Sequence, residues 1–533
     1  MGTLSKSDHR LSGSPARCTF QPNKLKSLTS ALTVSAIVAG LSLAVATETS
    51  AQNPRLELGR RLERFEHAWE TASTTQRVAA VPPLKTAVRS FFTLQLSEAG
   101  RQLDQAWLAV RKDAEVNELT KAMIGSQLLA SPLCAETGSN ALKIQLTSYY
   151  PTDTNPPVNT IASVKLTQTT GEPLAETQLS ISELEQGTSW QIEQIPEGDH
   201  LLSVAIQNAN SVFTLPSVTI SRITELNRRL QHLKDTAVAL KTTTRSQTAT
   251  AFDVTIASTL RDETRLIENV IEGLPQEADF PLLYRLKSCE AMLTIRSEPT
   301  DFANQWHGAK EVWLTLGKEL RSVPTRIHLP QETDKPLPVL FVFHGAGGSE
   351  NMFFETYGAG RVIDEAAKRN WIVISPRQGL FGMSLDISDM LDALDQFVPV
   401  DRKRIMLLGH SMGASQVIKQ IRKNPALPFA AVSLGGGGRM PSSDAKRSEH
   451  VAWYIGAGEQ DFGLGAAKQL KQSLEASEVR NRFKVYKNVE HLVVVQAAID
   501  DVFQFLDESV GKLTKPESNT PPKAPEKVLN EDR

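Results

Sequence analysis

This chain of 533 residues has few cysteines, little charge imbalance and no visible internal repeats. Its 3 cysteines show neither the setting of a cysteine nucleophile nor the spacing of a metal cluster. Its 58 basic residues nearly balance its 60 acidic ones, and no block of lysine or arginine stands out. We therefore expect no nucleic-acid partner and no anionic membrane partner. Composition and length indicate an ordinary globular protein with about three domains.

Long apolar runs are also scarce, and the one present lies near the N-terminus. It follows a basic stretch and ends at a small-x-small cleavage site, after Ala46 or Ala51, which is typical of a secretory signal peptide. We expect residues 1–51 to be removed and the mature protein to be secreted or periplasmic, without a stable membrane span. The alternative is an uncleaved anchor. In an oxidising compartment Cys134 and Cys289 would either pair or remain isolated buried thiols.

Three segments of different periodicity precede the C-terminal part of the chain. Apolar residues recur at helical spacing over residues 52–140, with a break expected at Pro82-Pro83, and again over residues 223–300. Between them, residues 141–222 alternate apolar and polar side chains between turn residues, which predicts a small β-sandwich. We expect the two helical regions to pack together around it.

Strands and helices alternate over residues 301–511. We predict strands near residues 311–316, 324–329, 338–343, 371–375, 404–409, 428–433, 451–456 and 482–487, and helices over 351–369, 384–397, 412–424, 464–476 and 492–509. Several of these strands are apolar throughout, which indicates a mostly parallel α/β sheet that is buried on both faces. Residues 512–533 are rich in Pro, Lys and Glu without an apolar face, so we expect a disordered tail.

The chemistry centres on Gly409-His-Ser-Met-Gly413, which lies between an apolar strand and a helical pattern. Gly-x-Ser-x-Gly in this strand–turn–helix context is the nucleophile elbow. The turn is so sharp that the residues two before and two after Ser411 nearly touch, so a side chain at either would clash. We expect Ser411 to adopt a strained backbone conformation that presents its hydroxyl above the end of the strand.

Asp461 and His491 also follow predicted strands, where α/β sheets carry their reactive residues. An imidazole titrates near neutrality, so His491 can take the proton of Ser411 and return it to a leaving group. Asp461 would hold the other ring nitrogen and stabilise the imidazolium, in the chain order Ser, Asp, His. Glu459 and Asp444 are alternatives to Asp461.

A glycine-rich loop, residues 344–348, ends another apolar strand. Its glycines allow backbone N–H groups to turn toward the serine. We expect the N–H groups of Ala346 and Met412 to form the oxyanion hole, with Gly347 as a second candidate. For His344 we predict a structural role in ordering this loop.

Residues from about 310 to 511 resemble the α/β-hydrolase superfamily, in particular the secreted esterase group that includes polyhydroxybutyrate-depolymerase-like and feruloyl-esterase-like enzymes. The matching stretches are Phe343–Gly348, Val400–Ile405, Gly409–Gly413 and Gly456–Asp461. The resemblance implies an eight-stranded sheet whose second strand is antiparallel, and ester hydrolysis through an acyl-enzyme without a cofactor. It makes Ser411 the nucleophile, Asp461 the acid and His491 the base.

The sequence thus predicts an exported serine hydrolase that cleaves carboxylic esters. A serine peptidase of the same fold and a catalytically inactive surface-binding protein are the alternatives. The short loops at residues 377–385 and 435–450 indicate a shallow, open site that suits a polymeric or bulky ester. We predict no metal, because one run of acidic residues alternates with apolar ones as the solvated face of a helix: Asp386, Asp389, Asp392 and Asp395.

Overall fold

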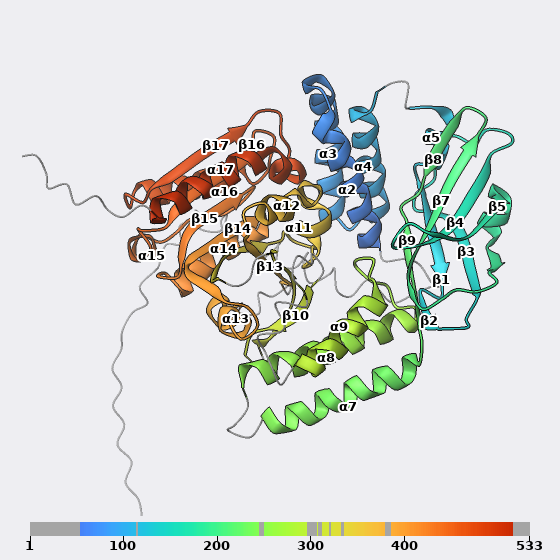
Figure 1. The fold of residues 1–533 in the computed structure, drawn as a ribbon. Helices are drawn as coiled ribbons and strands as arrows, with labels where there is room; N and C mark the ends of the chain where they lie inside the picture. The colour runs from blue at the N-terminus through green and yellow to red at the C-terminus, as the bar shows by residue number, and fades with distance from the viewer. Residues whose placement is uncertain are drawn as a thin grey trace, which may run out of the picture. The chain divides into compact units, whose positions relative to one another are not determined.

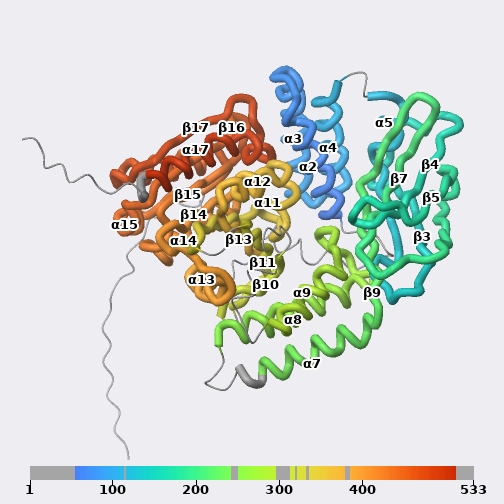
Figure 2. The backbone as a smooth tube through the Cα atoms, viewed as in Figure 1, coloured from blue at the N-terminus to red at the C-terminus, as the bar shows by residue number. Residues whose placement is uncertain are grey.

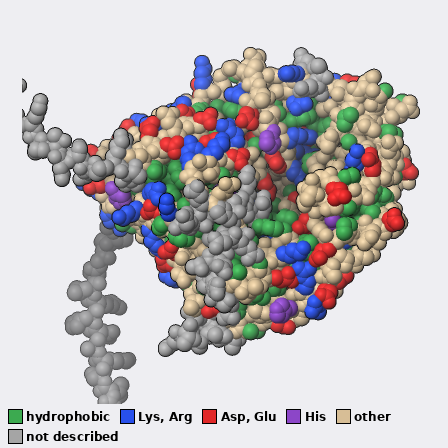
Figure 3. All heavy atoms as spheres, in the orientation of Figure 1, with side chains coloured by type: hydrophobic (Ala, Val, Ile, Leu, Met, Phe, Trp, Pro, Cys, Tyr) green, Lys and Arg blue, Asp and Glu red, His purple; other side chains and the backbone are tan. Residues whose placement is uncertain are grey.

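The computed structural model of the chain describes residues 54–112, 116–244, 250–295, 306, 312–318, 321–331, 335–378 and 385–514. The predicted signal peptide lies outside these residues. No helix among them combines the length and the hydropathy that crossing a membrane requires. On the face drawn in Figure 3, basic and acidic side chains are interspersed rather than gathered by sign.

Three helices begin the described chain: α2 (Pro54–Thr71), α3 (Thr74–Phe92) and α4 (Leu96–Val110). The break expected at Pro82-Pro83 is wrong, because both prolines lie inside α3. The chain turns instead at Leu94, whose φ is 62°. An internal proline costs a helix about 3 kcal/mol. Burial of the α3 face that carries Leu84 and Ala87 offsets this cost.

The strands of the middle region begin earlier than the predicted residue 141. They are β1 (Ser126–Ser131), β2 (Cys134–Glu136), β3 (Ala141–Ser148), β4 (Ile161–Gln168), β5 (Pro173–Ser180), β6 (Thr188–Gln191), β7 (Gly198–Asn208), β8 (Ser211–Thr214) and β9 (Val218–Ile223), with the short helices α5 (Glu118–Met123) and α6 (Ile181–Gln186). One sheet has the order β1-β3-β6, and the other has the order β2-β9-β7-β4-β5 with β8 beside β7. The sequence of β1 shows no clear alternation, so its strand character depends on its antiparallel pairing with β3.

The C-terminal part contains an eight-stranded sheet in the order β10-β11-β13-β12-β14-β15-β16-β17. Its strands are β10 (Val312–Leu316), β11 (Val323–His328), β12 (Leu337–Phe343), β13 (Ile372–Pro376), β14 (Val400–His410), β15 (Pro428–Leu434), β16 (Ala452–Gly458) and β17 (Asn481–Tyr486). β11 is antiparallel to both of its neighbours, and all other pairs are parallel. The predicted mostly parallel sheet with an antiparallel second strand is confirmed.

Seven helices of the described chain surround or flank this sheet: α11 (Met352–Glu355), α12 (Arg361–Ala367), α13 (Ile387–Leu394), α14 (Met412–Lys423), α15 (Ser442–Arg447), α16 (Leu464–Glu475) and α17 (Val494–Thr514), with the 3-10 turns η4 (Tyr357–Gly360) and η5 (His491–Val493). The single helix predicted over residues 351–369 is interrupted at η4. There Gly358, Ala359 and Gly360 have φ values of 63°, 52° and 79°. α17 continues to Thr514, two residues beyond the predicted start of the tail, and the remainder of that tail lies outside the described residues.

Both faces of the sheet are buried, as the apolar strands predicted. Along β12, Val339, Phe341 and Phe343 belong to one hydrophobic cluster and Leu340 and Val342 to another. The first cluster also contains residues of α13, α14 and α16, and of α7 (Leu226–Thr244), α8 (Ala251–Ile271) and α9 (Leu282–Thr294). The second contains residues of α12 and α17, of α2 to α4, and of both middle sheets.

The two predicted helical regions therefore do not pack together as expected. α2 to α4 and α7 to α9 form two separate groups of helices (Figures 1 and 2), because each group buries its apolar face in a different cluster. Cys134 and Cys289 are both free and buried in the cluster that contains α7 to α9. Of the two possibilities that the sequence left open for these cysteines, the structure shows isolated thiols.

Candidate active site

Ser411 lies in the sharp turn between β14 and α14. Its φ of 58° and ψ of −115° place it in a region that residues with a side chain rarely adopt. A Cβ atom at Gly409 would overlap the carbonyl oxygen of Gly413, and a Cβ at Gly413 would overlap that of Phe343. The crowding and the strain predicted for this elbow are both present.

His491 and Asp461 meet beside this turn. The imidazole Nδ1 lies 2.7 Å from Asp461 Oδ1, which also accepts a 2.6 Å hydrogen bond from the N–H of Gly463. Burial alone raises the pKa of the Asp461 carboxyl, but the hydrogen bond and the charge of His491 outweigh it and the pKa falls below its usual value. The side chains of His491 and Asp461 are both almost fully buried.

Gly435 makes this close pairing possible, since a Cβ there would lie 2.9 Å from Asp461 Oδ2 and 3.2 Å from His491 Nδ1. The alternatives to Asp461 lie elsewhere. Asp444 forms ion pairs with two arginines, and Glu459 accepts a hydrogen bond from the N–H of Asn488. Only Asp461 of these three acids contacts the histidine.

The glycine-rich loop is held by its own histidine. His344 is buried, and its Nδ1 lies 2.8 Å from the carbonyl oxygen of Gly345, while its Nε2 accepts a 3.0 Å hydrogen bond from the N–H of Gln378. Burial lowers the pKa of His344 to about 4, so the ring is neutral at physiological pH. This is the structural role predicted for His344.

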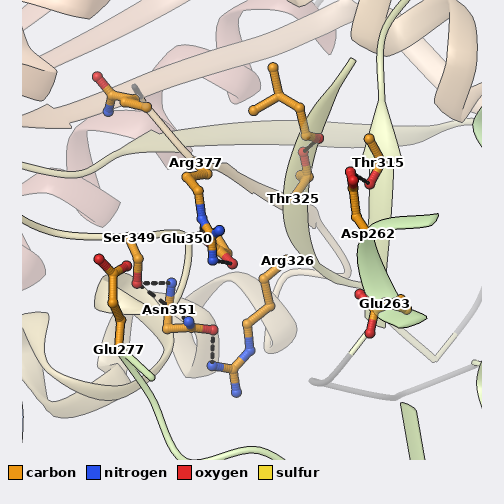
Figure 4. Close-up of polar contacts among 12 residues, drawn as sticks. Asp262, Glu263, Glu277, Thr315, Thr325, Arg326, Ser349, Glu350, Asn351 and Arg377 are labelled. Atoms are coloured by element: carbon orange, nitrogen blue, oxygen red, sulfur yellow. Dashed lines mark hydrogen bonds and ion pairs between the residues drawn. The ribbon is translucent and has the colours of Figure 1, made fainter. Parts of the chain in front are cut away.

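Charged side chains support the continuation of the same loop (Figure 4). Arg377 forms two hydrogen bonds of 2.7 Å with the buried carboxylate of Glu350. Arg326 donates to Asn351 at 3.0 Å and to Glu355 at 2.6 Å. If the loop moved and separated such a pair, a buried charge would be left without its partner, which is unfavourable. The paired charges therefore hold the loop in position.

Ser411 and His491 line one cavity together with Ala346 and Gly347. Ser411 and His491 line the same cavity, but no hydrogen bond between Ser411 Oγ and the imidazole is among the described contacts. Met412 is the first residue of α14, and the helix itself provides no acceptor for its backbone N–H. The structure thus brings together the residues that the sequence assigned to acyl transfer.

His410 and Phe462 are two neighbours of His491 whose contacts the sequence did not show. The buried His410 ring lies 3.0 Å, through Nε2, from the carbonyl oxygen of His491, and burial lowers its pKa to about 3. Phe462 packs on His491 with ring centroids 4.0 Å apart, although 60% of Phe462 is exposed. Phe92 of α3 contacts Phe462 edge to face at 5.9 Å.

One family model matches part of the C-terminal sheet region. Residues 378–502 match the model of the dienelactone hydrolase family. The C-terminal domain has the α/β-hydrolase fold. Its expected resemblance to this superfamily is confirmed, and the strand order of the sheet agrees with it.

Several solved structures are similar to this chain. A ferulic acid esterase has 17% sequence identity, with 37% of this chain and 96% of that chain covered and a TM-score of 0.32. The fluorophosphonate-binding serine hydrolase FphF of Staphylococcus aureus has 17% identity, with coverages of 35% and 92% and a TM-score of 0.30. Est1E from Butyrivibrio proteoclasticus has 10% identity, with coverages of 38% and 100% and a TM-score of 0.29.

The site of the hydrolase domain is not the shallow, open surface that the short loops suggested. Residues of α2, α3 and α4 line the same cavity as Ser411. Phe91 of α3 packs so closely on Gly347 that a Cβ there would overlap its ring. Loop length was a poor guide because the helices that line the cavity come from the N-terminal part of the described chain, far from the loops in sequence.

A second contact ties α2 to the hydrolase domain. The buried carboxyl of Glu66 accepts a 2.6 Å hydrogen bond from the N–H of Gly358 in η4. The preceding residue, Tyr357, accepts a 3.3 Å hydrogen bond from the N–H of Gly345 in the glycine-rich loop. The sequence predicts neither contact. Glu66 lies in a helix with many charged residues, where an acidic side chain is expected to face solvent.

The acidic residues of the 386–395 segment have structural roles. Asp386 caps α13, Asp389 pairs with Lys318 at 2.5 Å, and Asp392 pairs with Arg402 at 2.8 Å. Within the described ranges, no group of three or more His, Cys, Asp or Glu side chains has the arrangement of a metal site.

Proposed function

We propose that the protein is an exported serine hydrolase that cleaves carboxylic esters, with Ser411 as nucleophile, His491 as general base and Asp461 as the partner of the base. The observation that carries the proposal is the buried 2.7 Å contact between His491 and Asp461, in the wall of the cavity onto which the strained Ser411 opens. With Nδ1 held by the carboxylate, Nε2 is the ring nitrogen that is free to accept a proton.

The reaction follows from these positions. Ser411 Oγ forms a bond to the ester carbonyl carbon while His491 Nε2 accepts the hydroxyl proton. The N–H of Met412 and that of Ala346 or Gly347 stabilise the resulting oxyanion, each by about 3 kcal/mol. The bond to the alcohol breaks as His491 returns the proton to it, which leaves an acyl-enzyme. Water, deprotonated by His491, then attacks the acyl carbon and releases the acid and Ser411.

A fluorophosphonate probe tests the nucleophile, because it phosphonylates only an activated serine. We expect the full chain to be labelled and Ser411→Ala to be unlabelled. Ser415→Ala is the matched control, since Ser415 lies one turn further along α14 and donates to the carbonyl oxygen of Gly437 at 3.0 Å. Absence of labelling in folded wild-type protein would favour an inactive surface-binding protein.

The substrate bond is tested by comparing p-nitrophenyl esters with peptide amides of matched acyl groups. The alcohol of an ester is a better leaving group than the amine of an amide, so its departure depends less on protonation by a general acid. We expect turnover of esters and none of amides. Labelled protein that cleaves amides but no ester of any acyl length would identify a serine peptidase instead.

Export is tested by sequencing the N-terminus of protein recovered from outside the cytoplasm of an expressing cell. Cleavage at the predicted sites gives a mature chain that begins at Thr47 or Gln52. Retention of Met1 on a membrane-bound product would support the uncleaved anchor.

A further inference from the structure

The cavity beside Ser411 has two kinds of wall. One consists of the hydrolase residues of the proposed reaction, and the other consists of side chains from three helices outside that domain. The latter are apolar and mostly buried: Leu58, Leu62, Val88, Phe91, Ala99 and Leu103. Leu58 and Leu62 lie one helical turn apart on α2, so they present a continuous surface to the cavity.

The position of this apolar wall determines what it can contact. Phe91 packs against Gly347, a candidate oxyanion residue, and Ser411 and His491 line the same cavity. An acyl carbon bonded to Ser411 Oγ has to place its substituent in the cavity onto which the serine opens. The apolar wall is therefore in reach of the acyl group.

Charge and size narrow the class of acyl group. Among the described residues that line the cavity, Arg55 carries a formal charge, and Glu277 pairs with it at 2.9 Å. The cavity volume is about 120 Å³. For scale, an apolar cavity of about 150 Å³ holds one benzene molecule. A group of about four to six carbon atoms is of this size.

We propose that α2, α3 and α4 form the acyl-binding pocket of this enzyme, and that its substrates are esters of compact, uncharged, apolar carboxylic acids. The proposal rests on the proposed function of Ser411 and specifies its substrate. It makes Leu62, Ala99 and Leu103 specificity-determining residues, although they lie in a different region from the nucleophile. An ester whose acyl part continues as a polymer does not fit this pocket.

Acyl-chain profiles of p-nitrophenyl esters from acetate to decanoate test the pocket with the leaving group held constant. We expect kcat/KM of the full chain to rise about fourfold per methylene as apolar surface is buried, and to fall beyond about six carbons. p-Nitrophenyl hemisuccinate, which places a carboxylate in the pocket, should be at least tenfold poorer than the butyrate. A preference for the hemisuccinate would overturn the proposal.

Two variants test the wall itself, and a third is their matched control. Leu103→Ala should move the optimum to longer acyl chains, and Ala99→Leu should lower the ratio of kcat/KM for hexanoate to that for acetate by at least tenfold. Leu84→Ala is the matched control, because Leu84 is buried in α3 and does not line the cavity. It should leave the profile unchanged even if stability falls.

Labelling of Ser411 by the fluorophosphonate separates the two levels of the proposal. If wild-type protein is not labelled, the proposed function fails. If it is labelled and hydrolyses esters, but Leu103→Ala and Ala99→Leu both keep the wild-type profile, only the acyl pocket is refuted. Should one of these two variants not fold, the opposite shift expected of the other still decides the outcome.

Discussion

Glu66 offers a direct test of how α2 is held against the hydrolase domain. Its carboxyl group is fully buried, with Oε2 bonded to the N–H of Gly358 and Oε1 without a partner among the described residues. Burial raises the pKa of this carboxyl well above its ordinary value of 4.5, and the hydrogen bond from Gly358 lowers it only in part. We therefore expect the folded protein to retain a proton that the unfolded chain releases.

Proton linkage sets the sign and size of the effect. Above pH 4.5 and below the pKa of the folded state, the native protein binds one more proton at Glu66 than the unfolded chain does. The free energy of unfolding then falls as pH rises, by about 1.4 kcal/mol per pH unit from this group. Glu66→Gln keeps an oxygen that can accept from Gly358 and is neutral at every pH. The stability of the variant relative to wild type should therefore grow as pH rises above 4.5, by at most about 1.4 kcal/mol per pH unit.

Urea unfolding of the full chain at pH 5, 6 and 7 measures this difference through the transition midpoints. Glu70→Gln is the matched control, because it makes the same chemical change on an exposed side chain of the same helix. A difference between Glu66→Gln and wild type that stays constant over the three pH values would refute the reasoning. It would mean that the carboxyl at position 66 is not buried against η4 in solution.

Three further predictions concern the site and the core. Asp461→Asn should lower kcat by about 10³- to 10⁴-fold at neutral pH with unchanged folding, since the amide no longer stabilises the imidazolium; a loss below tenfold would contradict the assigned role. Gly409→Ala should lower the free energy of unfolding by about 3 kcal/mol or more, because the added Cβ would overlap backbone atoms. Gly465→Ala is the control, because Gly465 lies at an open helical position, and it should not destabilise the protein. A urea titration measures both variants. Cys134 and Cys289 should resist alkylation in native protein and react after denaturation. Burial raises the pKa of the Cys134 thiol to about 12 and raises the pKa of the Cys289 thiol well above its usual value. A disulfide-linked peptide in a digest would contradict this.

The eight-stranded sheet could be predicted because its strands carry an unusual local signal. β12 reads Leu-Pro-Val-Leu-Phe-Val-Phe, with apolar residues on both faces, which is stable only in a sheet covered on both sides. The glycines of the elbow carry a second signal, since Gly409 and Gly413 are required by backbone contact rather than by propensity. Both patterns are local in sequence, so they can be recognised without knowledge of the tertiary packing.

The apolar wall of the cavity could not be predicted in the same way. Leu58 and Leu62 repeat as they do in any amphipathic helix, and this spacing shows that a face is buried without showing against which partner. Glu66 lies in the charged helix α2, with Glu63, Arg64 and His67 near it in the sequence, so its residue type gives no indication that it is buried. Its burial depends on the turn at Gly358, whose neighbour Ala359 has a positive φ that its residue type does not suggest.

Besides the buried hydrogen bond from Gly358 to Glu66, apolar contacts contribute more than exposed polar ones to holding this wall in place. The exposed hydrogen bond from Lys85 to Gln460 contributes about 1 kcal/mol at most, whereas burying one leucine or phenylalanine side chain contributes about 1.5–3 kcal/mol. Leu62, Ala99 and Leu103, which are proposed to select the acyl group, belong to the same buried cluster as Phe353 and Tyr357 of the hydrolase domain, so they also contribute to packing α2 to α4 on it. Shortening Leu103 to enlarge the pocket should cost about 2–5 kcal/mol of stability. Enlarging the pocket therefore removes buried apolar contacts from this cluster, so the acyl selectivity and the stability of the site are coupled.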